Sequence, residues 1–180
     1  MFVAVELPSD VKDELWRARA GLEDLAPEAR WVPRDNLHLT LSFLGSVEDS
    51  EVAVVSRAVA DAVESMEDFP VSLDRLGAFP SERRARVLWA GLSDQAGGLR
   101  SLAESVIGNL QAFASGESKP FRPHVTLGRL SRPQAVDLSG HRVAPLGFIV
   151  NRVVLFESRL GGGAPRYGTL ATFPFVPSSR

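Results

Sequence analysis

A histidine, an apolar residue, a threonine and a second apolar residue occur in that order twice, at 38–41 and at 124–127. Side chains alternate between the two faces of a β-strand, so each string places its imidazole and its hydroxyl on one face. Two such strands facing each other offer a base, an acid and two hydroxyl donors. Displacement at a phosphodiester needs this set, because the nucleophile loses a proton, the leaving oxygen gains one, and the phosphoryl oxygens need donors.

Histidine suits both proton transfers, because its ordinary pKa of about 6.5 allows one neutral and one protonated copy near neutral pH. The chain has only three histidines, and two of them, His38 and His124, carry the pattern. The hydroxyls of Thr40 and Thr126 are the candidate ligands of the phosphate oxygens. Neither string carries Asp or Glu on the histidine face, so the sequence predicts neither a metal site nor a cofactor.

The segments before the two strings share the 86-residue spacing that separates the histidines. With that shift, the strand-like FVAVEL (2–7) aligns with LWAGLS (88–93). Apolar residues at helical spacing follow each strand, over 11–25 and over 99–113. The sequence therefore predicts a strand–helix–strand unit that is used twice, with a motif string as the last strand of each copy.

The remaining segments complete two small sheets. Apolar spacing predicts a helix over 48–66, and strands are expected at 70–76, 87–92, 143–149, 151–158 and 168–176. No linker or low-complexity tract separates the two copies. We therefore expect an α+β fold in which two small antiparallel sheets share one core and helices lie outside. Residues 1–180 should form a single domain of two lobes that meet near residue 80.

Composition restricts the class of protein. Hydrophobic residues make up 44% and charged residues 23% of the chain, which is typical of a soluble globular domain. Cysteine is absent, which excludes disulfides and thiolate chemistry and fits a cytoplasmic location. A net charge of −2 argues against broad, salt-driven binding to nucleic acid. No segment approaches the ~20 apolar residues of a membrane span, and we expect a monomer.

The chain resembles the two-histidine (2H) phosphoesterases, whose mark is a pair of His-x-Thr-x strings. It is more closely similar to the bacterial and archaeal RNA 2′,3′-cyclic phosphodiesterases, historically called 2′-5′ RNA ligases. The matching stretches cover nearly the whole chain. They are FVAVELP (2–8), NLHLTLSFLG (36–45), GAFP (77–80), RVLWAGL (86–92), PFRPHVTLGRL (120–130) and ESRLGGGAPRYGTLATFPF (157–175).

The resemblance implies a bilobal fold with both motif strands lining a central cleft. It also implies metal-independent hydrolysis of a 2′,3′-cyclic phosphate, on RNA ends or nucleosides, to a 2′-phosphomonoester. In these roles His38 is the proton donor to the 3′-oxygen, and His124 is the proton acceptor that activates water. Thr40 and Thr126 carry over as phosphate ligands, and Arg129 is a further candidate contact.

Strict alternation adds two expectations. It places Phe43 on the apolar face of its strand, which predicts core packing. It places Arg129 on the face opposite His124, so Arg129 reaches a phosphate only if it leaves the strand. Asp35 and Asn36, just before the first string, could orient an imidazole or form a turn, and the turn is the expectation.

Two alternatives remain open. The same site could join RNA ends through a 2′-5′ linkage, which reverses the bond-breaking step. A second class is a non-catalytic module that binds RNA or nucleotides. The two intact histidines favour catalysis, because a binding module needs neither a proton donor nor a proton acceptor.

Overall fold

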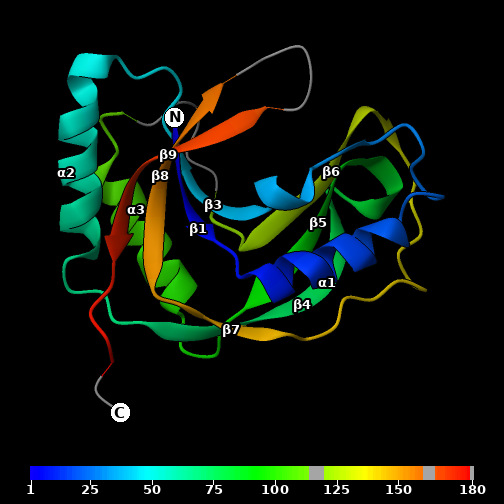
Figure 1. The fold of residues 1–180 in the computed structure, drawn as a ribbon. Coiled ribbons are helices and arrows are strands. Elements are labelled where there is room, and N and C mark those ends of the chain that lie inside the picture. Colours follow the sequence, from blue (N-terminus) through cyan, green and yellow to red (C-terminus); the bar gives the residue numbers. More distant parts are fainter. Residues whose placement is uncertain (114–119, 160–164, 179–180) are drawn as a thin grey trace.

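The computed structural model describes residues 1–113, 120–159 and 165–178 (Figure 1). The strands are β1 (Phe2–Glu6), β2 (Arg30–Trp31), β3 (His38–Phe43), β4 (Phe69–Phe79), β5 (Ala85–Ser93), β6 (His124–Gln134), β7 (Gly147–Val150), β8 (Arg152–Arg159) and β9 (Arg166–Pro174). The α-helices are α1 (Ser9–Ala20), α2 (Val52–Val63) and α3 (Gly98–Asn109). Short 3₁₀ turns are η1 (Arg34–Asn36), η2 (Asp49–Glu51) and η3 (Glu82–Arg84).

The named strands form one curled antiparallel sheet. Their order is β7-β4-β5-β6-β3-β1-β8-β9, with the short β2 paired to β6. The two expected sheets are the halves of this sheet, one ending at β6 and the other beginning at β3. Between β3 and β6 the described pairing is a single residue pair, Leu39 with Val125. The α+β class is confirmed, and the motif strands lie where its two halves join.

The strand–helix–strand unit does occur twice, as β1-α1-β3 and as β5-α3-β6. The predicted alignment of its first strands is wrong by one residue. Ala4 lies opposite the first motif threonine and Trp89 opposite the second, which is a spacing of 85 residues rather than 86. The shift brings Val3 into correspondence with Leu88, and both are fully buried. Burial of one face sets strand register, because a one-residue slip exchanges the two faces.

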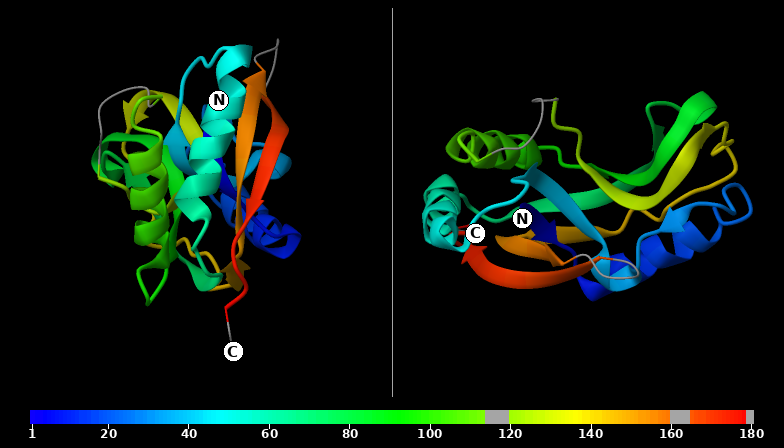
Figure 2. Two further views of the ribbon diagram at one scale, coloured as in Figure 1. Left: turned by 90° about the vertical axis from the view of Figure 1, so that its left-hand side faces the viewer. Right: turned by 90° about the horizontal axis from the view of Figure 1, so that it is seen from above.

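Helices α2 and α3 lie side by side at one end of the sheet, and α1 lies toward the other end (Figure 2). The hydroxyl of Ser105 on α3 donates to the carbonyl oxygen of Ala62 on α2, at 2.7 Å. On α1, Val11 and Leu15 are completely buried. No helix in the described ranges is both long and apolar enough to cross a membrane.

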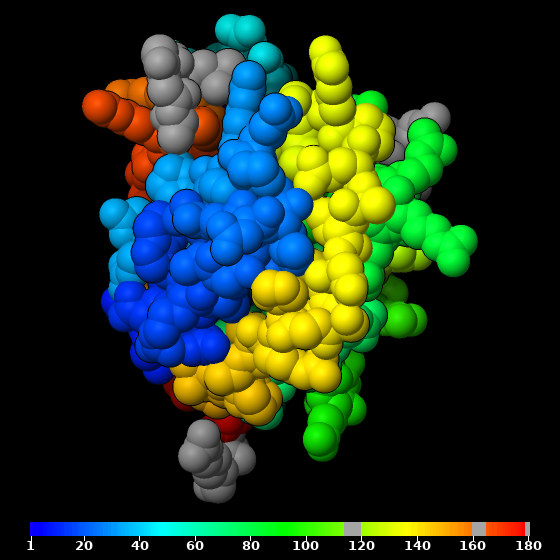
Figure 3. Space-filling model, turned by 90° about the vertical axis from the view of Figure 1, so that its right-hand side faces the viewer, coloured from blue at the N-terminus to red at the C-terminus, as the bar shows by residue number. Residues whose placement is uncertain are grey.

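The segment after β6 packs over α1 and the loop that follows it (Figure 3). The amide of Gln134 donates to the carbonyl oxygen of Leu25 at 2.9 Å, and the backbone N–H of Ala144 donates to Glu14 at 2.9 Å. These bonds tie residues of the second motif strand and its extension to the helix that precedes the first. These hydrogen bonds hold the two copies of the unit against each other.

Candidate active site

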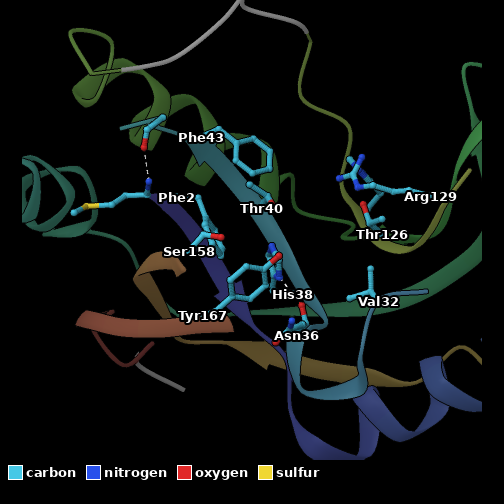
Figure 4. A pocket seen from close by; sticks show the side chains of 13 residues that line it. Phe2, Val32, Asn36, His38, Thr40, Phe43, Thr126, Arg129, Ser158 and Tyr167 are labelled. Atoms are coloured by element: carbon cyan, nitrogen blue, oxygen red, sulfur yellow. Dashed lines mark hydrogen bonds between the residues drawn. The ribbon is translucent and has the colours of Figure 1, made fainter. Parts of the chain in front are cut away.

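Four side chains from the two motifs form a frame at the join of the sheet. The single residue pair between β3 and β6 lies one position after each histidine. The antiparallel register therefore sets His38 opposite Thr126 and Thr40 opposite His124. Each histidine faces the threonine of the other motif, and the two histidines occupy diagonal corners. All four line one cavity of about 420 Å³. Figure 4 labels His38, Thr40 and Thr126 among the side chains of its lining.

The two imidazoles are held by the same hydrogen bond. Nδ1 of His38 lies 2.6 Å from the carbonyl oxygen of Asn36, and Nδ1 of His124 lies 2.7 Å from that of Arg122. A carbonyl oxygen can only accept, so each Nδ1 carries the hydrogen. Nε2 is then the nitrogen that takes a proton in the neutral ring and gives one in the charged ring.

The carbonyl that orients His38 belongs to a well-anchored turn. The side-chain amide of Asn36 donates to the carbonyl oxygen of Pro165 at 2.7 Å, which ties η1 to the start of β9. Arg34 fixes η1 on α1, where its guanidinium donates to the hydroxyl of Ser9 at 2.7 Å and pairs with Asp13 at 2.5 Å. The expected turn at Asn36 is therefore also the support of the first imidazole. The sequence signal for this role is the position of Asn36, two residues before His38. Arg122 occupies the same position relative to His124.

Aromatic rings from other strands pack against both imidazoles. Phe2 on β1 stacks on His38 with ring centroids 4.8 Å apart, and Tyr167 on β9 meets it edge-on at 5.4 Å. Phe79 on β4 meets His124 edge-on at 5.0 Å. Sequence reasoning missed these three rings, because each comes from a strand that only the tertiary fold brings to the motif.

Burial lowers the pKa of both histidines below the ordinary value of 6.5. The hydrogen bonds to the backbone carbonyls oppose this effect, because they favour the charged ring. The nearby charge of Arg129 lowers both pKa values further, and Lys12 and His124 add to the effect on His38. At pH 7 the neutral ring is therefore favoured at both positions, and an anion in the cavity would raise the pKa of its neighbours.

Arg129 lines the cavity, contrary to the expectation from strict alternation. The pairing of β6 with β5 skips a residue: Trp89 lies opposite Thr126, but Leu88 lies opposite Gly128. The extra residue, Leu127, makes a β-bulge, which changes the face that later side chains take. Arg129 therefore lies on the same side as Thr126 and faces the cavity across from β3 (Figure 4).

Phe43 also lines the cavity, and the prediction that it packs in the core is wrong. Its side chain is 56% exposed. In β3, Val3 lies opposite Ser42 and Ala4 opposite Thr40, so Leu41 is the extra residue of a second bulge. Each bulge begins three residues after the motif histidine. The side chain five residues after each histidine is consequently turned into the cavity. This side chain is Phe43 in the first copy and Arg129 in the second.

The described parts of the chain contain no group of three or more His, Cys, Asp or Glu side chains arranged to hold a metal ion. Metal-independent chemistry stays a prediction, as does the role of each site residue.

Comparison with known proteins identifies the family. A model described as LigT-like phosphoesterase matches residues 5–89. The Escherichia coli protein named RNA 2′,3′-cyclic phosphodiesterase is 34% identical over 180 residues, which cover 94% of this chain and 93% of that protein. A Thermus thermophilus protein of the same name is 33% identical, over 96% of this chain and 88% of that protein. A Geobacillus stearothermophilus protein of that name is 29% identical, and the chain spans 57% of its length.

Solved structures agree with the sequence relatives. Escherichia coli LigT crystallised with 3′-AMP has a TM-score of 0.83 at 27% identity, over 97% of this chain and 96% of that one. A Thermus thermophilus structure has a TM-score of 0.78 at 30% identity, over the same shares. Because relatives above 30% identity align over most of both lengths and the curled sheet is shared, the chain belongs to the LigT-like phosphoesterase family of the 2H superfamily.

Proposed function

We propose that the protein hydrolyses 2′,3′-cyclic phosphates, on RNA ends or on nucleosides, to 2′-phosphomonoesters without a metal ion. The observation that carries the proposal is the diagonal pair of imidazoles in one cavity. Each has Nδ1 bound to a carbonyl and Nε2 left for proton transfer. Relatives of this chain are named RNA 2′,3′-cyclic phosphodiesterase, and LigT has been crystallised with 3′-AMP and with ATP.

In the proposed reaction a water molecule attacks phosphorus and gives its proton to Nε2 of His124. The bond from phosphorus to the 3′-oxygen breaks, and that oxygen takes a proton from Nε2 of His38. The hydroxyls of Thr40 and Thr126 and the guanidinium of Arg129 stabilise the charge on the non-bridging oxygens. The choice of His38 as acid and His124 as base follows the family resemblance, because the frame itself is nearly symmetric.

Because the pKa values of the histidines are lowered, binding of the substrate itself favours the protonated form of the acid. A proton donor is disfavoured in the empty cavity, because burial and Arg129 both oppose the charged ring. The negative charge of the bound phosphodiester favours the imidazolium, so binding and protonation of the acid reinforce each other.

The test is turnover of a nucleoside 2′,3′-cyclic phosphate in the presence of EDTA. His38→Ala and His124→Ala should each lower kcat by about 10²–10⁴-fold, the usual contribution of one acid or base. Wild-type activity that disappears in EDTA refutes the metal-free chemistry. Full activity in both variants refutes the histidine assignment. Binding without turnover by the wild type would instead support the non-catalytic module.

The direction of proton transfer has its own test. In a substrate whose bridging 3′-oxygen is replaced by sulfur, the leaving thiolate needs little protonation, because a thiol is far more acidic than an alcohol. His38→Ala should then recover most of its lost rate, and His124→Ala should not. Recovery by His124→Ala alone would reverse the two roles.

The proposal includes residues 1–180 acting as one bilobal domain, as a monomer in the cytoplasm. A cysteine-free sequence supports the location. Sedimentation at micromolar concentration tests the monomer, and a dimer would contradict it.

A further inference from the structure

A second cavity, of about 720 Å³, adjoins the candidate active site on the side of His38. The residues that line both cavities are Val32, Asn36, Arg129 and Tyr167. Asn36 and Tyr167 flank His38: the carbonyl oxygen of the first accepts from the imidazole, and the ring of the second meets it edge-on (Figure 4). His124 lines the first cavity but not the second. We call the second one the Arg30 cavity, after the β2 arginine in its lining.

Two arginines lie side by side in the lining of the Arg30 cavity. Arg30 on β2 is the direct antiparallel partner of Arg129 on β6. Directly opposite residues project from the same face of a sheet, and like charges in such a pair destabilise it. Within the described parts of the chain, neither guanidinium has an ion pair or a hydrogen-bond partner. By contrast, Arg57 and Arg75 each pair with an aspartate. A bound anion would therefore offset a repulsion that no carboxylate of the described chain relieves.

The direction of the proposed reaction indicates which anion this is. In an in-line displacement the attacking water and the leaving 3′-oxygen lie on opposite sides of phosphorus. With the water beside His124 and the 3′-oxygen beside His38, the ribose lies on the His38 side, where the Arg30 cavity opens. The next charged group of a nucleotide beyond its ribose is the phosphate on the 5′-oxygen. The planar fork of a guanidinium matches the oxygens of such a phosphate.

We propose that the Arg30 cavity binds the phosphate on the 5′-oxygen of the reacting nucleoside, with Arg30 as its specificity-determining ligand. Arg129 then lies between this phosphate and the cyclic one. A nucleoside 2′,3′-cyclic phosphate without a 5′-phosphate leaves Arg30 with nothing to bind, so the site selects nucleotides that carry this second phosphate. The volume of about 720 Å³ is within the range of about 300–1,000 Å³ for a whole small-molecule ligand, which leaves room for more than a phosphate. The inference rests on the proposed function, because it uses the same phosphorus position and the same role for His38.

The test compares the hydrolysis of three 2′,3′-cyclic phosphates: those of adenosine, of 5′-phosphoadenosine and of the dinucleotide ApA. For the wild type, kcat/KM should be roughly tenfold higher with 5′-phosphoadenosine than with adenosine, the low end for a hydrogen bond to a charged group. The low end applies because Arg30 is exposed. The gain should appear in KM, because the 5′-phosphate is held equally before and in the transition state. The dinucleotide identifies the source of the phosphate: a value at least as high as that of 5′-phosphoadenosine assigns the site to an RNA chain, and a lower value assigns it to a terminal monophosphate.

Arg30→Ala should bring the ratio of kcat/KM between 5′-phosphoadenosine and adenosine substrates toward one, and Arg30→Lys, which keeps the charge, should retain part of it. Arg100→Ala is the matched control: it removes an exposed arginine on α3 that has no ion pair among the described residues, and should keep the wild-type ratio. Equal kcat/KM values for the two substrates in the wild type, or a high ratio that Arg30→Ala leaves intact, overturn the phosphate site. Hydrolysis of adenosine 2′,3′-cyclic phosphate by the wild type is the separate check on the proposed function. If that activity is present and the ratio is one, only the phosphate site is refuted.

Discussion

Replacing Gly77 with alanine tests how the β4–β5 half of the sheet supports His124. A Cβ at Gly77 would lie 2.3 Å from two ring carbons of Trp89, whereas ordinary contacts begin at 3.4 Å. The indole must therefore retreat by about 1.1 Å, the difference between these distances. Its ring neighbours are Phe79, with centroids 5.0 Å apart, and His124, at 6.3 Å. A displaced indole consequently disturbs the packing that orients the second imidazole.

The expected cost combines two opposing effects. Forcing extra volume into a packed site typically costs about 1–3 kcal/mol. The alanine itself restricts the unfolded chain, which stabilises by about 0.4–1 kcal/mol. The midpoints of these ranges, about 2 and about 0.7 kcal/mol, give a net loss of about 1.3 kcal/mol in the free energy of unfolding for Gly77→Ala. For a chain of this length that lowers Tm by about 3–5 °C. A misplacement near 1 Å can also cost about a hundredfold in rate, so kcat should fall as well.

Two further glycines provide graded controls for the same chemical change. A Cβ at Gly91 would meet the Trp89 ring at 3.3 Å, and a Cβ at Gly108 on α3 would meet no atom within 4 Å. Thermal unfolding should therefore rank Gly108→Ala above Gly91→Ala and Gly91→Ala above Gly77→Ala. Gly108→Ala should exceed the wild type, because glycine inside a helix costs about 1 kcal/mol relative to alanine. Equal Tm values for Gly77→Ala and Gly108→Ala would refute the contact between Gly77 and the indole.

Arg129→Ala should move both limbs of the pH profile of kcat/KM to higher pH, because removing a positive charge raises the pKa of both histidines. Arg129→Lys keeps the charge and should leave both limbs in place. Unshifted limbs in the alanine variant would contradict the electrostatic reasoning. Leu39→Ala should cost about 2–5 kcal/mol in urea unfolding, because it empties a fully buried position at the join. Phe43→Ala should cost far less, since its ring is turned out of the core; a comparable loss would disprove the β3 bulge. The free energy of unfolding should fall as pH drops from above 6.5 through the lowered pKa values of His38 and His124, because the unfolded chain binds protons more tightly. A double variant, His38→Gln with His124→Gln, should lose less of this free energy on acidification. An equal loss in the double variant would exclude the histidines as the source of the pH dependence.

Local patterns determined the residue types of the candidate site and much of the framework. Alternation within each motif was enough to place His38 beside Thr40, and His124 beside Thr126, because three consecutive strand residues leave little freedom. The shared spacing of the motifs predicted the strand–helix–strand units, because burial of one face constrains helices and strands over many residues. These inferences held over short distances, where covalent geometry dominates.

Alternation failed two residues beyond each motif, because the last residue of each motif is the extra residue of a bulge. A bulge depends on how one strand hydrogen-bonds to its neighbour: β3 departs from register against β1, and β6 against β5. Nothing in the strand's own pattern reveals this departure. Phe43 was consequently expected in the core and Arg129 outside the cavity, and the structure places both in it.

By itself, the sequence determined that two imidazole–hydroxyl pairs exist and that each lies on one face of a strand. Tertiary structure alone decided that the pairs meet diagonally, since this follows from the single antiparallel residue pair that joins the two halves of the sheet. It also decided which rings from β1, β4 and β9 pack against the imidazoles, and the burial that lowers the pKa values of both histidines. The physical reason is that register, bulges and burial belong to pairs of strands, and no single strand encodes its partner.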